Sequence, residues 1–124
     1  MTDKKRILIV DDEDDLRNML KFRLEATGYT VLEASDGQEG LDMARAQKPD
    51  MIILDLMLPK MDGFKVCRML KFDKIYKNIP VVMLTAKVQE KDKMIGQEMG
   101  ADAYLTKPFE PNELVVKIKE LLNQ

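Results

Sequence analysis

The sequence has 124 residues, 45% hydrophobic and 34% charged, which is typical of one globular domain. A net charge of −2 disfavours a nucleic-acid-binding domain, and the apolar runs are too short to cross a membrane, so we expect the protein to bind neither. The first residues show no cleavage-site pattern of a secretory signal, so we expect a cytoplasmic location. One cysteine and no histidine exclude an intramolecular disulfide, zinc sites built from Cys and His, and histidine-dependent nucleophilic catalysis.

The first half of the chain predicts two strand–helix pairs. Residues 7–10 predict a buried strand, because continuous apolarity is typical of strands covered on both faces. A helical stripe of apolar residues follows and ends near Gly28, where glycine commonly stops a helix. Residues 30–34 form the second predicted strand, and a helix with Leu41 and Ala44 on its apolar face comes after it.

The second half predicts three more pairs. Apolar runs indicate strands at residues 51–54, 81–84 and 103–105. The helices that follow are indicated by an apolar stripe around Cys67, a weaker one over residues 94–99, and a clear one over 114–122.

Strict alternation of five strands with five helices predicts an α/β fold over a single domain, residues 1–124. The fold would be a doubly wound, five-stranded parallel sheet with helices on both faces and right-handed crossovers. The order of the strands across the sheet cannot be read from the sequence pattern.

Ligands of such sheets bind beyond the carboxyl ends of the strands. Asp11 and Asp12 follow the first strand, Asp55 ends the third, Thr85 follows the fourth and Lys107 follows the fifth. If the first and third strands are neighbours, the three aspartates converge at this edge.

Three clustered carboxylates repel one another, and a hard divalent cation such as Mg²⁺ relieves that repulsion through oxygen ligands. A carboxylate can also serve as a nucleophile and form an acyl phosphate. A metal, a lysine and a hydroxyl are the groups that stabilise the charge developing in phosphoryl transfer. The edge of the predicted sheet supplies each of these parts.

Four segments carry a resemblance to a known family. They are ILIVDDE at residues 7–13, DMIILDLMLP at 50–59 with MDG at 61–63, PVVMLTA at 80–86, and GADAYLTKPF at 100–109. In this order and spacing they resemble the receiver domain of two-component response regulators (CheY-like). The resemblance covers the chain nearly end to end.

The resemblance implies that Asp55 accepts a phosphoryl group from a histidine kinase or a histidine phosphotransfer protein. It implies that Mg²⁺ is bound by the carboxylates of Asp12 and Asp55, by the backbone carbonyl of Met57, and by Asp11 through water. Such a domain catalyses its own phosphorylation and dephosphorylation and is not otherwise an enzyme.

The resemblance also implies a switch. Lys107 would pair with the phosphoryl oxygens, Thr85 would move to hydrogen-bond them, and Tyr104 would change rotamer. The flavodoxin-like strand order 2-1-3-4-5 and a cis peptide before Pro108 are implied as well. Partners would read the face of the fourth helix, fifth strand and fifth helix. The output partner or fused output domain is unknown, and a monomer or a phosphorylation-dependent dimer is expected.

Other functions stay open. An aspartate-nucleophile phosphohydrolase would typically need a second aspartate two residues after the nucleophile, where this chain has Met57. A flavin or dinucleotide module would need a glycine-rich loop after the first strand, which here is acidic. A binding module independent of phosphorylation is the third alternative. Among single residues, Asp14 and Asp15 are interpreted as capping and dipole residues, and Cys67 as part of the core.

Overall fold

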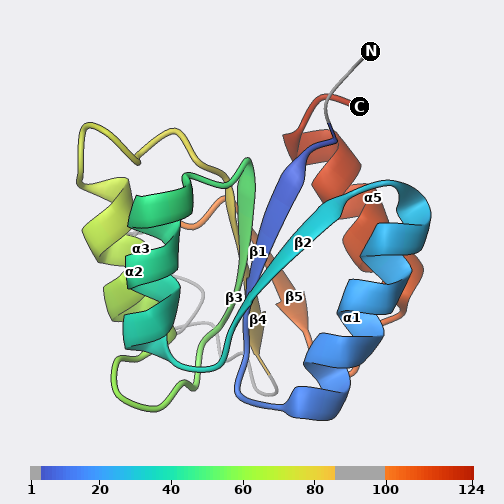
Figure 1. The fold of residues 1–124 in the computed structure, drawn as a ribbon, viewed down its shortest axis with the longest axis horizontal. Coiled ribbons are helices and arrows are strands. Elements are labelled where there is room, and N and C mark those ends of the chain that lie inside the picture. The colour runs from blue at the N-terminus through green and yellow to red at the C-terminus, as the bar shows by residue number, and fades with distance from the viewer. Residues whose placement is uncertain (1–3, 86–99) are drawn as a thin grey trace.

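The computed structural model describes residues 4–85 and 100–124, and its centre is one parallel sheet (Figure 1). The strands are β1 (Arg6–Val10), β2 (Thr30–Ala34), β3 (Met51–Asp55), β4 (Val81–Thr85) and β5 (Ala103–Thr106). Their order across the sheet is β2-β1-β3-β4-β5, with every neighbouring pair parallel. The predicted doubly wound sheet and the strand order implied by the resemblance are therefore confirmed.

Helices cover both faces of the sheet, as Figure 1 shows. The described helices are α1 (Asp14–Thr27), α2 (Gly37–Gln47), α3 (Gly63–Lys71) and α5 (Pro111–Leu121). The apolar sides of α2 and α3 pack on one face, and those of α1 and α5 on the other. The helix predicted over residues 94–99 lies outside the described residues. Within the described part of the chain, no helix has the length and apolarity needed to cross a bilayer.

The core has two halves because successive side chains of a strand point to opposite faces of the sheet. In β1, Leu8 and Val10 pack toward α2 and α3, while Ile7 and Ile9 pack toward α1 and α5. Strand β3 repeats the pattern and is buried along its whole length. Continuous apolar runs are thus required in the central strands, since neither face of these strands meets water.

Two Asp-Gly pairs begin helices. The carboxylate of Asp36 accepts a hydrogen bond from the backbone N–H of Glu39 at 2.8 Å, and Asp62 accepts one from that of Lys65 at 2.9 Å. These bonds satisfy N–H groups that have no partner inside the first turn of a helix.

The start of α1 differs from the prediction. Its N-cap residue is Glu13, which makes no side-chain capping bond, and Asp14 and Asp15 occupy the first turn. The capping interpretation of these two aspartates was wrong, while their favourable position beside the positive end of the helix dipole holds.

The loop after β3 presses closely on the helices beside it. A Cβ atom at Gly63 would lie 2.3 Å from the carbonyl oxygen of Asp55, and one at Gly37 would lie 1.8 Å from that of Met61. Only glycine permits approaches this close. The backbone carrying Asp55 is therefore fixed by direct contact with the start of α3.

The thiol of Cys67 is fully buried in the core between α3 and the sheet. Burial raises its pKa to about 11, so at pH 8 only about one thiol in a thousand is ionised. We expect the native protein to react with a disulfide reagent such as DTNB at least a hundredfold more slowly than the protein in urea. A Cys67→Ala, Ala46→Cys variant, with its thiol at an exposed position, is the control. Equal rates for the two native proteins would contradict the burial of Cys67.

Candidate functional site

Three carboxylates meet at the carboxyl edge of the sheet. Asp11 and Asp12 directly follow β1, and Asp55 is the last residue of the neighbouring strand β3. Carboxylate oxygens of these residues lie within 4.8 Å of one another. Asp11 is completely buried and Asp55 is 5% exposed, whereas Asp12 is exposed to solvent. The pairing of β1 with β3 is what brings these side chains together.

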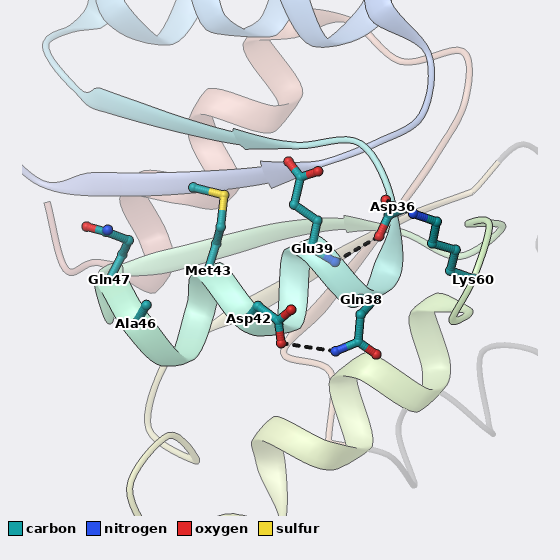
Figure 2. Close-up of a pocket in the computed structure, with 8 residues that line it drawn as sticks. All are labelled: Asp36, Gln38, Glu39, Asp42, Met43, Ala46, Gln47 and Lys60. Atoms are coloured by element: carbon teal, nitrogen blue, oxygen red, sulfur yellow. Dashed lines mark hydrogen bonds and ion pairs between the residues drawn. The ribbon is translucent and has the colours of Figure 1, made fainter.

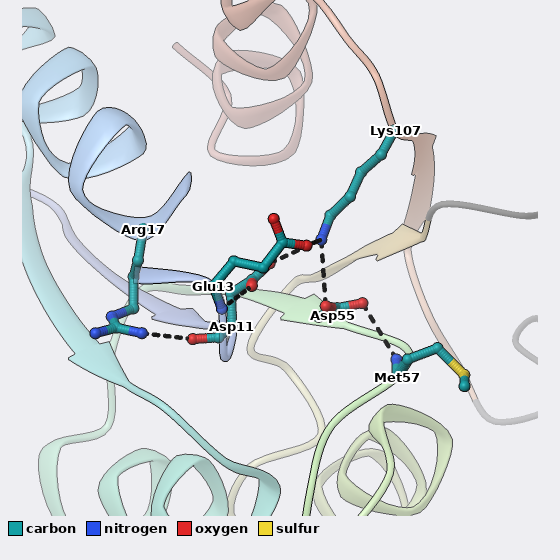
Figure 3. Close-up of polar contacts among 6 residues, drawn as sticks. All are labelled: Asp11, Glu13, Arg17, Asp55, Met57 and Lys107. Carbon is teal, nitrogen blue, oxygen red and sulfur yellow. Dashed lines mark hydrogen bonds and ion pairs between the residues drawn. The ribbon is translucent and has the colours of Figure 1, made fainter. Parts of the chain in front are cut away.

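Lys107 follows β5, which lies two strands away from β3, and its side chain extends to this cluster (Figure 3). Its Nζ atom lies 3.0 Å from Oδ2 of Asp11, 3.2 Å from Oδ2 of Asp55 and 3.3 Å from Oε1 of Glu13. Only 13% of the lysine side chain is exposed. One ammonium group therefore joins the carboxylate at the end of β3 to two carboxylates in the loop after β1.

The two buried carboxylates are held in the same way. Oδ1 of Asp55 accepts a hydrogen bond from the backbone N–H of Met57 at 3.1 Å, and Oδ1 of Asp11 accepts one from that of Glu13 at 2.8 Å. In both residues the other oxygen faces Lys107. Each carboxylate is thus oriented by a backbone donor two residues further along the chain.

Burial and neighbouring charges shift the pKa values of Asp55 and Lys107. Burial raises the pKa of Asp55, and the Met57 N–H and the Lys107 ammonium oppose this only in part. Burial would lower the pKa of Lys107, but its contacts with Asp11 and Asp55 outweigh this and raise it. At neutral pH the lysine is therefore firmly protonated, while ionisation of Asp55 costs free energy.

Thr85, Tyr104 and Met57 were also predicted from the sequence to belong to the site. Thr85 ends β4 with its backbone beside that of Thr106, and its side chain lies outside the described part of the structure. Tyr104 is partly buried against the core on the α3 side of the sheet. The side chain of Met57 is 74% exposed beside Asp55, and the Lys107–Pro108 peptide is cis as the resemblance implied.

Two residues at this edge were not given roles from the sequence. Glu13 pairs with Lys107, and Arg17 donates to the backbone carbonyl of Asp11 at 2.7 Å. The sequence places both near the cluster, but the direction of the side chains depends on how α1 packs. The spacing of Asp14 and Arg17, three residues apart on a helix, was the one local signal of an ion pair.

A separate open hollow runs along α2 (Figure 2). Six of its eight lining residues carry polar side chains. Of these, Asp36 already accepts from the Glu39 N–H, and Gln38 already donates to Asp42. None of the lining residues is a site residue predicted from the sequence. The acidic cluster, not this hollow, gathers the groups suited to chemistry.

The donor set at the acidic edge fits a hard divalent cation. Three carboxylates within 4.8 Å supply the oxygen ligands that Mg²⁺ prefers, and one of them is open to solvent. A buried carboxylate beside an ammonium group is also placed to act as a nucleophile toward a phosphoryl group. The fold and this edge define a flavodoxin-like α/β domain with a candidate site for a cation and a phosphoryl group.

Comparison with known proteins gives the family. Residues 7–119 match the response regulator receiver domain. The chain belongs to this family, the signal-receiving modules of two-component systems. It is 39% identical to a putative response regulator from Chloroflexus aurantiacus, with a TM-score of 0.92, covering 98% of this chain and 100% of the other. The chemotaxis response regulator CheY4 of Vibrio cholerae is 34% identical, with a TM-score of 0.90, covering 96% and 99%.

Curated relatives are longer proteins. The alkaline phosphatase synthesis transcriptional regulatory protein PhoP of Bacillus subtilis is 49% identical over 97% of this chain and 49% of its own length. The phosphate regulon transcriptional regulatory protein PhoB of Pseudomonas aeruginosa is 48% identical over 97% of this chain and 52% of its own length. The chain thus spans about half the length of these relatives.

Removing the charge of Asp55 should stabilise the metal-free protein. Because burial raises the pKa of Asp55, the cost of its ionised form is absent below its unfolded pKa of about 4 and grows as pH rises toward the folded value. We expect Asp55→Asn to melt a few degrees higher than the wild type at pH 7 in EDTA, with the difference shrinking toward pH 4.

Thermal melts followed by circular dichroism test this, with the exposed Asp42→Asn as control. A lower melting temperature for Asp55→Asn at pH 7 would show that its pairing with Lys107 outweighs the cost of burial.

Proposed function

We propose that the chain is a phosphoacceptor switch in which Asp55 takes a phosphoryl group from a histidine kinase or a histidine phosphotransfer protein. The observation that carries this proposal is the position of the Asp55 carboxylate, buried at the sheet edge, 3.2 Å from Lys107 and beside Asp11 and Asp12. In the transfer, a carboxylate oxygen of Asp55 bonds to phosphorus. The phosphorus–nitrogen bond of the donor breaks, and its electron pair leaves with the imidazole.

The carboxylates of Asp12 and Asp55 and the backbone carbonyl of Met57 would hold Mg²⁺, with Asp11 acting through water. When bound, the ion offsets the negative charge that gathers on the phosphoryl oxygens. Lys107 supplies a further positive charge beside Asp55. Its ammonium group already contacts Asp55, so a short movement would bring it to a phosphoryl oxygen.

Signalling would follow from movement of two further residues. Thr85, at the end of β4, would hydrogen-bond the phosphoryl group, and Tyr104 on β5 would repack. The face that includes β5 and α5 would then change and alter partner binding. Control of a downstream partner of unknown identity, as a monomer or a phosphorylation-dependent dimer, completes the proposal. Residues 1–124 would form one receiver domain, and a cytoplasmic location stays a prediction.

The domain would catalyse its own phosphorylation and dephosphorylation, using the groups around Asp55. Turnover of external phosphoesters is less well supported, because position 57 holds methionine where a phosphohydrolase of this kind would need a second acid. The exposed thioether of Met57 cannot donate or accept a proton for a leaving group.

Mass spectrometry tests the acceptor directly. Incubation with acetyl phosphate and Mg²⁺ should add one phosphoryl group to the wild-type chain, because a small donor suffices when the domain supplies the catalytic groups. The adduct should be absent with EDTA and in Asp55→Ala, and Lys65→Ala, at an exposed position on α3, should behave as wild type. An adduct that persists in Asp55→Ala would overturn the assignment.

Met57 should lengthen the life of the phosphorylated form. Its apolar side chain cannot position an attacking water molecule, whereas an amide or a carboxylate at this position can. We expect Met57→Asn and Met57→Glu to release phosphate about tenfold faster, equivalent to about 1.4 kcal/mol on the barrier. Single-turnover release of labelled phosphate measures this, with Lys65→Gln as control. Unchanged rates in both variants would remove this role for Met57.

A further inference from the structure

Arg17 contacts the backbone directly beside the acidic cluster. It lies in the first half of α1, and one terminal nitrogen donates a hydrogen bond to the carbonyl oxygen of Asp11 at 2.7 Å (Figure 3). The other terminal nitrogen lies 2.7 Å from Asp14, and Nε lies 3.4 Å from Glu33 on β2. With only 15% of its side chain exposed, Arg17 is held on several sides.

The carbonyl that Arg17 contacts belongs to the peptide bond joining Asp11 to Asp12. A peptide unit is planar, so fixing its oxygen fixes the rotation of the whole unit and thereby the position of the Cα atom of Asp12. The unit that follows Asp12 is held as well, because the N–H of Glu13 donates to Oδ1 of Asp11 at 2.8 Å. The preceding unit is already fixed, because the N–H of Asp11 donates to the carbonyl of Ala34 at 3.1 Å. Asp12 therefore lies between two held peptide units, and the contact of Arg17 helps to set the direction in which the Asp12 side chain leaves the backbone.

Asp12 depends on this control more than its neighbours do. Asp11 and Asp55 are each anchored by a backbone N–H and by Lys107. Across residues 4–85 and 100–124, no group hydrogen-bonds the carboxylate of Asp12. That carboxylate completes the cluster of three acids, and with no side-chain anchor the region that it can reach depends on its backbone.

We propose that Arg17 is a positioning residue for divalent-cation binding, acting through the Asp11–Asp12 peptide unit to aim the Asp12 carboxylate at the ion. The inference rests on the proposed function, since it requires Asp12 to be a ligand. Arg17 itself does not touch the ion. It belongs to the outer contacts that orient ligands, whose loss commonly weakens metal binding by about 10- to 100-fold.

The charge of Arg17 predicts the opposite effect. A cation beside three carboxylates competes electrostatically with a bound metal ion, so deleting its charge would by itself strengthen metal binding. If Arg17 positions Asp12, affinity falls in the order wild type, Arg17→Lys, Arg17→Met, because lysine can still donate to the carbonyl and methionine cannot. If only charge matters, Arg17→Met binds the ion most tightly.

The experiment measures Mn²⁺ binding by the electron paramagnetic resonance signal of the free ion, with no phosphodonor present. We expect affinity about tenfold weaker than wild type in Arg17→Met and partial recovery in Arg17→Lys. Arg17→Gln, neutral but polar, gives the same comparison if Arg17→Met fails to fold, as judged by circular dichroism in EDTA. Asp14→Asn, which removes an exposed partner of Arg17 and leaves the carbonyl bond, should stay within about twofold of wild type.

The outcomes distinguish the role of Arg17 from the proposed cation site itself. Wild-type affinity or tighter binding in Arg17→Met and Arg17→Gln overturns the role of Arg17 alone, as does an equal loss in Asp14→Asn. Asp12→Asn locates the bound ion and should lose most of the affinity. If Asp12→Asn binds Mn²⁺ as the wild type does, the ion is not held at the acidic edge, and the proposed cation site fails together with this inference.

Discussion

The acidic cluster depends on one constraint, the contact of the Lys107 ammonium group with the buried carboxylates of Asp11 and Asp55. Asp11 is fully buried and Asp55 nearly so, and their carboxylates lie close enough to repel each other strongly in surroundings with little water. Lys107 offsets this repulsion from 3.0 and 3.2 Å. Truncating the lysine would leave buried like charges facing each other, which is far more costly than losing a surface ion pair.

The rest of the fold holds this arrangement rigidly. The acids stand at the ends of the two central strands, whose side chains are packed on both faces, so the strand ends cannot shift without opening the core. Gly63 lets the start of α3 press against the carbonyl of Asp55. Packing of the apolar core thus fixes the distances among the charged groups at this edge. Each of these charges would be costly to bury without a partner of opposite charge.

Much of this could be predicted from the sequence because the signals are local. Continuous apolar runs follow from burial on both faces of a strand, and in a parallel sheet all strand ends with the same direction meet at one edge. Asp11, Asp55 and Lys107 could therefore be placed at the same edge of the sheet by position alone, whereas their close approach depends on which strands are neighbours. The order of the strands could not, because it depends on the path of the crossovers, and it came from the resemblance.

Other features depend on tertiary packing or on ambiguous local signals. An Asp-Gly pair suits a turn and the start of a helix equally well, so Asp62-Gly63 is interpreted from the sequence as a turn, whereas it begins α3 in the structure. In the same way, a run of five acids does not show which carboxylate a lysine nearly a hundred residues later will contact. Glu13 is a partner of Lys107 only through tertiary packing, whereas Asp14 and Arg17 pair locally, three residues apart on α1.

The three partners of Lys107 differ in how easily they can be lost. The side chain of Glu13 is 62% exposed, so water replaces its contact with the lysine at little cost, typically below about 1 kcal/mol. Asp11 is completely buried, and separating it from the lysine would leave an uncompensated charge away from water. A lysine that moves toward a new anion at Asp55 would therefore give up Glu13 first and keep Asp11. The burial of one acid and the exposure of another thus set the direction in which the ammonium group can move.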